Sequence, residues 1–146
     1  MRRRVLVVTL AVLMTVLMVV PAAEAQQKGP LAPIEAGLDA YRSGGAEAAV
    51  RAWLRGGPLE GDTNAMAQGN MLKSIEAFYG GYRSYELVAE REIGASTRFA
   101  FIIMSYEKGP LFGRFILFRQ AEDWTIVQFQ VHTDPGEVWP DELIAP

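Results

Sequence analysis

The chain has 146 residues, a formal net charge of −3 at pH 7 and no cysteine. The lack of cysteine excludes disulfides, thiolate nucleophiles, zinc–thiolate sites and iron–sulfur clusters. The acidic balance, with basic residues scattered singly beyond the N-terminus, disfavours binding to nucleic acid or to an anionic membrane surface.

The N-terminus has the pattern of an export signal. Three arginines at positions 2–4 precede a run over residues 5–20 that is apolar except for Thr9 and Thr15, and a small-x-small cleavage motif ends at Ala25. We therefore predict a signal peptide over residues 1–25 and a periplasmic or secreted mature chain. The alternative is an uncleaved anchor, but a run of 16 residues is shorter than the about 20 that cross a bilayer. Processing would remove three arginines and one glutamate, which brings the net charge to about −5.

Three helices are predicted after a short linker over residues 26–33. Apolar residues recur at helical spacing in three segments, which glycine pairs end at positions 44–45, 56–57 and 80–81. Asp62 or Thr63 is the predicted cap of the third helix. The predicted core rows of the three helices are Ile34, Leu38 and Tyr41; Val50, Trp53 and Leu54; and Met71, Ile75, Phe78 and Tyr79.

The pattern then changes to strands. Aromatic and β-branched residues fill residues 84–93, 97–106, 111–120 and 124–132, with short turns between them. Such short connections make neighbouring strands antiparallel. We predict an α+β fold, with three N-terminal helices packed on a curved four-stranded antiparallel sheet in a single domain over residues 34–146.

The second and third predicted strands are apolar on both faces. Phe99, Phe101 and Ile103 alternate with other apolar residues, and so do Phe115 and Leu117. A sheet face left to water is normally polar. We therefore expect the second face to be covered, either because the sheet curls around the helices or because another subunit packs on it. Contiguous apolar patches usually mark partner sites, which favours a homodimer.

The order of elements resembles the nuclear transport factor 2-like superfamily. The segments that carry the resemblance are LDAYRSGGAEAAV at residues 38–50 and WTIVQFQ at residues 124–130, within a similarity over roughly residues 34–131. The chain departs from the usual layout, because residues 56–61 are too few for the strand pair that commonly lies between the second and third helices. The resemblance implies a conical fold that encloses a pocket, often in dimers, and that serves isomerases, dehydratases and non-enzymatic modules. Fold alone does not choose among these functions.

Three residues are candidates for catalysis. His132 is the sole histidine and Asp134 lies two residues further on, so the pair has the chemistry of a general base with an orienting carboxylate. The resemblance implies a tyrosine that donates to an oxyanion, and Tyr85 is the candidate. The alternative, which we favour, is a solvent-edge histidine and a tyrosine that packs its ring.

A second set suggests a ligand site. Gln128 and Gln130 share a strand face with Trp124 by alternation, and Tyr79 and Tyr82 lie near the helix-to-strand junction. Together they could line the mouth of a pocket for a small, largely apolar ligand. The alternative is a solvated or interface strand face. One histidine, no cysteine and carboxylates without loop spacing predict no metal site, and no cofactor motif is present.

Two further predictions concern the sheet and the tail. Four arginines lie on or beside the predicted strands: Arg91, Arg98, Arg114 and Arg119. Either Arg91 and Arg114 form a basic spot for a carboxylate ligand beside the second strand, or the arginines pair across strands with Glu86, Glu90 or Glu107. We favour the cross-strand pairing. Trp139 lies between prolines in the tail, and we expect it to dock on the domain or on a partner subunit.

Three functions remain possible. The favoured one is an exported non-enzymatic module that dimerises or binds a protein partner through its sheet. The alternatives are a binder of a small apolar ligand and an isomerase- or dehydratase-like enzyme.

Overall fold

The structure is a computed structural model that describes residues 29–145. Its elements, in chain order, are α1 (Ala32–Leu54), α2 (Thr63–Tyr79), β1 (Tyr82–Ile93), β2 (Thr97–Tyr106), β3 (Pro110–Gln120), β4 (Asp123–His132) and the short 3₁₀ helices η1 (Pro135–Glu137) and η2 (Asp141–Leu143). The predicted signal peptide, residues 1–25, lies outside the described residues. So do residues 26–28 of the predicted linker.

The described part of the chain has two α-helices, and the predicted boundary between the first and second of three helices is a kink within α1. Gly45 leaves helical geometry with φ 77° and ψ −171°, but the helix resumes at once, and α1 therefore kinks at the glycine pair and does not end there. The predicted helix ends at Gly56-Gly57 and Gly80-Gly81 are confirmed, because α1 ends at Leu54 and α2 ends at Tyr79. The Asp62 carboxylate accepts from the N–H of Ala65 at 2.7 Å and caps α2, and Gly80, with φ 83°, follows its last residue.

The four predicted strands are confirmed to within two residues at each end. They form one antiparallel meander in the order β1-β2-β3-β4. Two irregularities matter for the site. The first lies in β1 between Leu87 and Ala89. The second lies in β4, because Ile116 pairs with Gln128 but Leu117 pairs with Ile126. Val127 is therefore an extra residue in β4, as in a β-bulge.

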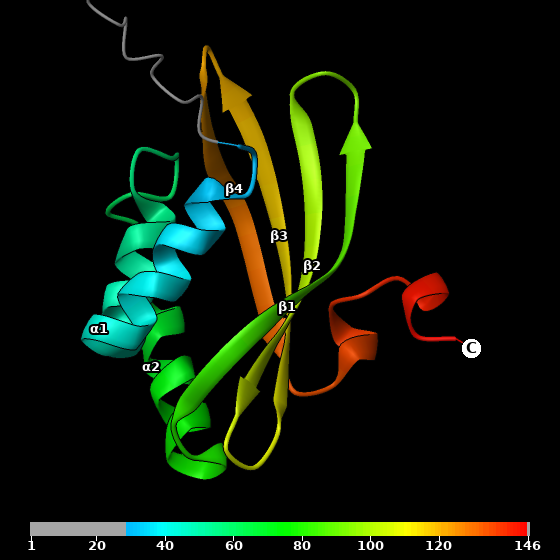
Figure 1. Cartoon of the computed structure of the whole chain (residues 1–146). Coiled ribbons are helices and arrows are strands. Elements are labelled where there is room, and N and C mark those ends of the chain that lie inside the picture. The colour runs from blue at the N-terminus through cyan, green and yellow to red at the C-terminus, as the bar shows by residue number, and fades with distance from the viewer. Residues whose placement is uncertain (1–28, 146) are drawn as a thin grey trace, which may run out of the picture.

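Both helices lie on one face of the sheet (Figure 1). The core there is centred on Trp53, whose ring lies 5.1 Å from that of Phe115 and whose Nε1–H donates to the carbonyl of Ile34 at 3.1 Å. Gly37 permits this approach, since a Cβ at that position would lie 2.0 Å from the indole Nε1. Buried side chains fill the space between helices and sheet, and the hollows described below lie at its margins.

Helix α2 contributes Leu72 to this core and packs Met71, Ile75 and Tyr79 of its predicted core row against it. It packs mainly against α1 and buries Gly69 and Leu72. Its predicted core row is wrong in part, because Phe78 is 73% exposed. A helix that packs on another helix buries a narrower stripe than one that lies on a sheet.

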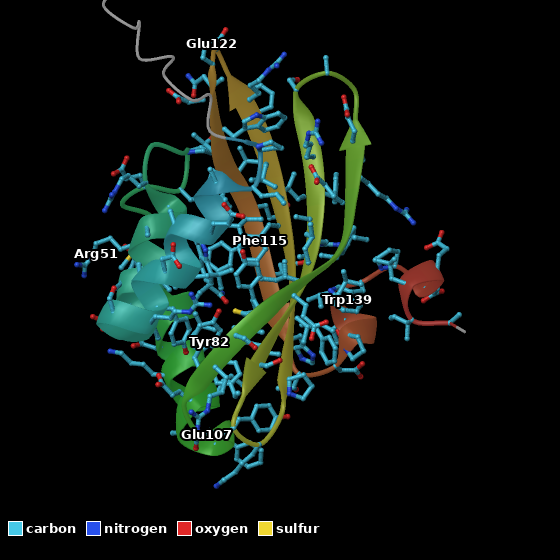
Figure 2. The ribbon with its side chains drawn as sticks, in the orientation of Figure 1. Arg51, Tyr82, Glu107, Phe115, Glu122 and Trp139 are labelled. Carbon is cyan, nitrogen blue, oxygen red and sulfur yellow. The ribbon has the colours of Figure 1, made fainter. Side chains whose placement is uncertain are left out.

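The C-terminal segment lies on the opposite face of the sheet, which we call the outer face (Figure 2). The predicted docking of Trp139 is confirmed, and it is on the chain's own domain. The Trp139 Nε1–H donates to the carbonyl of Gly113 at 3.0 Å, and its ring meets that of Phe112 edge-on at 5.0 Å. Val138 and Phe101 are buried beside it. Within residues 29–145, no helix combines the length and apolar character that crossing a bilayer requires.

Candidate functional site

The structure does not bring the predicted catalytic residues together. His132 is exposed at the end of β4, and its Nδ1 accepts from the backbone N–H of Asp134 at 3.0 Å. The Asp134 carboxylate instead accepts from the N–H of Gly136 and caps η1. Tyr85 stands opposite Met104, on the helix-side face of the sheet. His132 and Asp134 therefore meet through the backbone, and Tyr85 belongs to another face.

The predicted ligand residues are also separated. Because Val127 is an extra residue, the alternation in β4 reverses there, and Trp124 packs with the helix-side core. Gln128 and Gln130 pair with Ile116 and Arg114 on the outer face. The prediction that Trp124 and the two glutamines share one face is wrong, since a one-residue slip moves a side chain to the other face of a sheet.

Tyr79 and Tyr82 occupy structural positions. The ring of Tyr79 packs against Gly109. Tyr82 belongs to a tyrosine cluster, with its ring 4.7 Å from that of Tyr41 and 5.8 Å from that of Tyr106. The Tyr106 hydroxyl donates to that of Tyr41 at 3.2 Å. Burial raises the pKa of Tyr41 to about 12 and also raises the pKa values of Tyr82 and Tyr106, so these side chains are packed, neutral groups.

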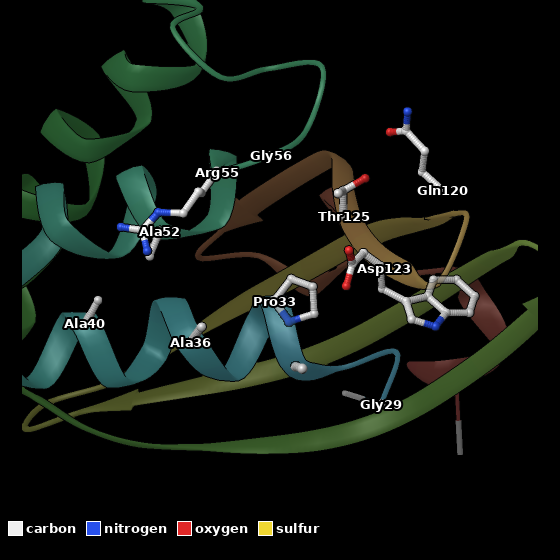
Figure 3. Close-up of a pocket in the computed structure, with 12 residues that line it drawn as sticks. Gly29, Pro33, Ala36, Ala40, Ala52, Arg55, Gly56, Gln120, Asp123 and Thr125 are labelled. Atoms are coloured by element: carbon white, nitrogen blue, oxygen red, sulfur yellow. The ribbon is translucent and has the colours of Figure 1, made fainter. Parts of the chain in front are cut away.

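A groove of about 570 Å³ runs between α1 and the start of β4 (Figure 3). Alanines 32, 36, 40 and 52 form much of its wall, and Arg55, Asp123 and Trp124 supply polar and aromatic character. The Arg98 and Arg119 guanidinium carbons lie 5.6 and 6.0 Å from the centre of the Trp124 ring. Trp124 was a predicted ligand residue. No sequence signal pointed to Arg55 or Asp123, because the fold alone brings the end of α1 to the β3–β4 turn.

A smaller hollow of about 310 Å³ lies beside the edge of β4. Gln130 and His132 line it together with Met71 of α2 and Val138 of the C-terminal segment. Its lining residues come from both sides of the edge strand and include the carboxylate of Glu137. Within residues 29–145, no hydrogen bond or ion pair joins Glu137 to His132. Among residues 29–145, no three histidine or carboxylate side chains gather in a way that would hold a metal ion.

The outer face of the sheet is only partly covered. The C-terminal segment packs on Phe101 and Phe112, in the half farther from the β1–β2 turn. In the other half Ile93 is 54% exposed, Phe118 is 41% exposed and Ile116 is half-buried. Phe99 is half-buried at the border, where it packs against the covered cluster. We call these four side chains the outer patch. They share one face because Phe99 pairs with Ile116 and Thr97 pairs with both Ile93 and Phe118.

Two arginines and two amides flank the outer patch. Arg91 stands opposite Phe99, and Arg114 lies between Phe101 and Gln130, with Gln128 beyond Ile116. The Arg114 Nη2 donates to the Gln130 Oε1. The predicted pairing of arginines with glutamates is confirmed for Arg98, which contacts Glu90 at 2.6 Å on the helix side. It does not hold for Arg114.

Comparison with known proteins yields little. No protein-family model matches this chain, and no curated protein matches it. A solved structure of a DUF4783 family protein from Bacteroides uniformis ATCC 8492 is similar over 48% of this chain and 63% of its own length, with 8% identity and a TM-score of 0.36. A likeness at that level carries no argument about function, so the proposals below depend on this chain's own residues.

Proposed function

We propose that the chain is an exported, non-enzymatic module that binds a protein partner through the outer patch. The observation that carries the proposal is the bare apolar half of a sheet face whose other half is covered by the chain's own C-terminus. Apolar side chains gathered on one surface mark interaction sites more often than those scattered singly. The Asp134 carboxylate caps η1 and Tyr85 lies on the helix-side face, so neither forms a reactive group with His132, which supports a binding role over a catalytic one.

The filled space between helices and sheet gives further support. Side chains such as Leu38, Trp53 and Phe115 are fully buried there, so a ligand has no room in the centre of the domain. The order of helices followed by a four-stranded meander supports membership of the nuclear transport factor 2-like superfamily, which we retain as a proposal together with export.

Site-specific photo-crosslinking tests the proposal. A photoreactive phenylalanine analogue at position 118 should give a discrete, light-dependent adduct in producing cells. The same analogue at position 77, which is exposed on α2, should give none. The adduct should disappear in Ile93→Asp, because a charge in the patch opposes apolar contact. If position 118 gives no adduct, or if the adduct survives Ile93→Asp, the proposal is wrong.

The groove supports a second candidate, binding of a small and largely apolar molecule. Its volume of about 570 Å³ falls within the range of ligand sites, which usually combine apolar walls with a few polar groups. Hexanoate and hexylammonium test whether Arg55 or Asp123 anchors such a molecule. Groove binding predicts a rise in Tm that Ala36→Phe, which fills the groove, abolishes and Ala77→Phe on α2 preserves. A rise that Ala36→Phe leaves intact would exclude the groove as the site.

A further inference from the structure

Two half-buried arginines on neighbouring strands have opposite surroundings. Arg98 of β2 points to the helix side and contacts Glu90 at 2.6 Å and Glu92 at 3.2 Å. Arg114 of β3 lies on the outer face, and its only hydrogen-bond partner among the described residues is the Gln130 amide. Both Nε atoms are buried without a hydrogen-bond partner in the described part of the chain. The two arginines thus differ in one respect. Carboxylates neutralise Arg98, whereas no carboxylate of the described residues forms an ion pair with Arg114.

The Arg114 guanidinium is paired with a neutral amide, whereas a half-buried arginine is usually paired with a carboxylate. A half-buried cation loses hydration, and a neutral amide accepts one hydrogen bond without compensating the charge. The natural complement is a carboxylate, whose two oxygens match the planar donors of arginine.

Residues 29–145 supply no such carboxylate at Arg114. The outer-face positions around Arg114 are held by Phe99, Phe101, Ile116 and Gln130. Glu86 is on the same face but stands opposite Ile103, in the covered half, and Glu137 lines the hollow beside Gln130. No ion pair joins either of them to Arg114 within residues 29–145.

A second copy of the chain is a poor complement for this surface. In a twofold dimer each subunit presents the same patch to the other. Each copy would then bring Arg91 and Arg114 to the interface. Like charges placed against each other oppose association, so the charge pattern favours a different protein.

We propose that the outer patch binds a segment of another protein in which one carboxylate is flanked by apolar side chains. The carboxylate lies on Arg114, Arg91 adds a second positive charge at the rim, and the apolar side chains cover Ile93, Phe99, Ile116 and Phe118. This inference rests on the proposed function, because it names the chemistry of the partner at the same surface.

Selection from a phage-displayed library of random linear peptides tests the inference. The purified chain should enrich peptides with Asp or Glu between apolar residues. Replacing that acid by its amide in a selected peptide should weaken binding about tenfold or more, because the pair is partly buried. The same replacement should have no effect with Arg114→Gln. Arg51→Gln is the matched control, since it removes one exposed positive charge from α1 (Figure 2) and should leave the preference intact.

The outcomes separate the two proposals. Enriched peptides without an acid, or a preference for acid that survives Arg114→Gln, would overturn the inference while leaving the patch as a binding surface. If Phe118→Asp enriches the same peptides as the unaltered chain, the proposed function itself is wrong. A dimer of the purified chain that Phe118→Asp dissociates would also overturn the inference, because the occupant would then be a second copy.

Discussion

Trp139 holds the C-terminal segment on the outer face of the sheet and so limits the area of that face that is exposed. Its ring is 9% exposed and lies on Phe112, and its indole N–H is satisfied by the carbonyl of Gly113. The C-terminal segment therefore packs as part of the domain and is not a loose tail. Removal of this segment would take buried apolar side chains out of the domain and would expose Phe101 and Phe112 to solvent.

Replacement of Trp139 by alanine should reduce the free energy of unfolding by about 3 kcal/mol, because a large buried ring is lost. Trp139→Phe keeps most of the packing and loses the hydrogen bond, which costs about 1 kcal/mol. Urea unfolding of the two variants and the unaltered chain gives both values. If Trp139→Ala unfolds at the same urea concentration as the unaltered chain, the docking does not contribute to stability.

The tyrosine cluster predicts a loss of stability at alkaline pH. Burial raises the pKa of Tyr41 to about 12 and that of Tyr106 as well. In the unfolded chain both would ionise near pH 10. Stability from these groups is therefore complete below about pH 10 and is lost as the pH rises toward 12.

Unfolding measured at about pH 9 and about pH 11, on either side of the unfolded pKa of tyrosine, checks this prediction. The free energy of unfolding should fall between the two, and Tyr41→Phe should reduce the fall because it removes one of the linked groups. An equal fall in both proteins would show that Tyr41 ionises as readily in the folded state as in the unfolded one.

At the scale of the elements, the kink in α1 depends on Gly45. Its φ of 77° and ψ of −171° lie in a region that is essentially restricted to glycine. Gly45→Ala should therefore destabilise the chain by about 1–3 kcal/mol.

Gly69 of α2 provides the control for this substitution. A Cβ there meets its neighbours at an ordinary 3.6 Å, and Gly69→Ala in a helix should stabilise the chain by about 0.5–1 kcal/mol. Thermal or urea unfolding of the two variants should shift in opposite directions. A shift in the same direction would contradict the conformational argument.

The sequence predicted the positions of the strands well and the faces of β4 poorly. Turn residues and runs of aromatic and β-branched residues are local signals, so the bounds of the strands can be predicted from the sequence. The extra residue at Val127 depends on pairing with β3 and has no signal in the sequence of β4 alone. That single irregularity placed Trp124 in the groove and Gln128 on the outer face. Similarly, the glycine pair at 44–45 predicted a break, but packing of both halves of α1 on the same core retained one kinked helix.

At the scale of the whole molecule, the apolar outer face was predictable and its cover was not. Alternation in β2 and β3 showed that both faces are apolar, whereas the return of the C-terminal segment onto the sheet depends on contacts between Trp139 and distant residues such as Gly113. The groove likewise joins Arg55 to Asp123 across the chain. Pairwise contacts over such separations leave no periodic trace in a single sequence.

The two faces of the sheet are covered by different parts of the chain. Helices cover one face of the sheet and the C-terminal segment lies on the other (Figure 1). The outer patch is the apolar part of that second face that the segment does not cover. The central claim is that this remainder is bare in the isolated chain and covered when the partner is present.

Cysteine labelling tests that claim most directly, because the natural chain contains no cysteine and a single one introduced at position 118 reports without background. Phe118→Cys should react rapidly with a small maleimide in the purified protein and several-fold more slowly in producing cells, while Ala77→Cys on α2 reacts at a rate that reflects access to reagent alone. Equal protection of the two positions in cells would contradict the account.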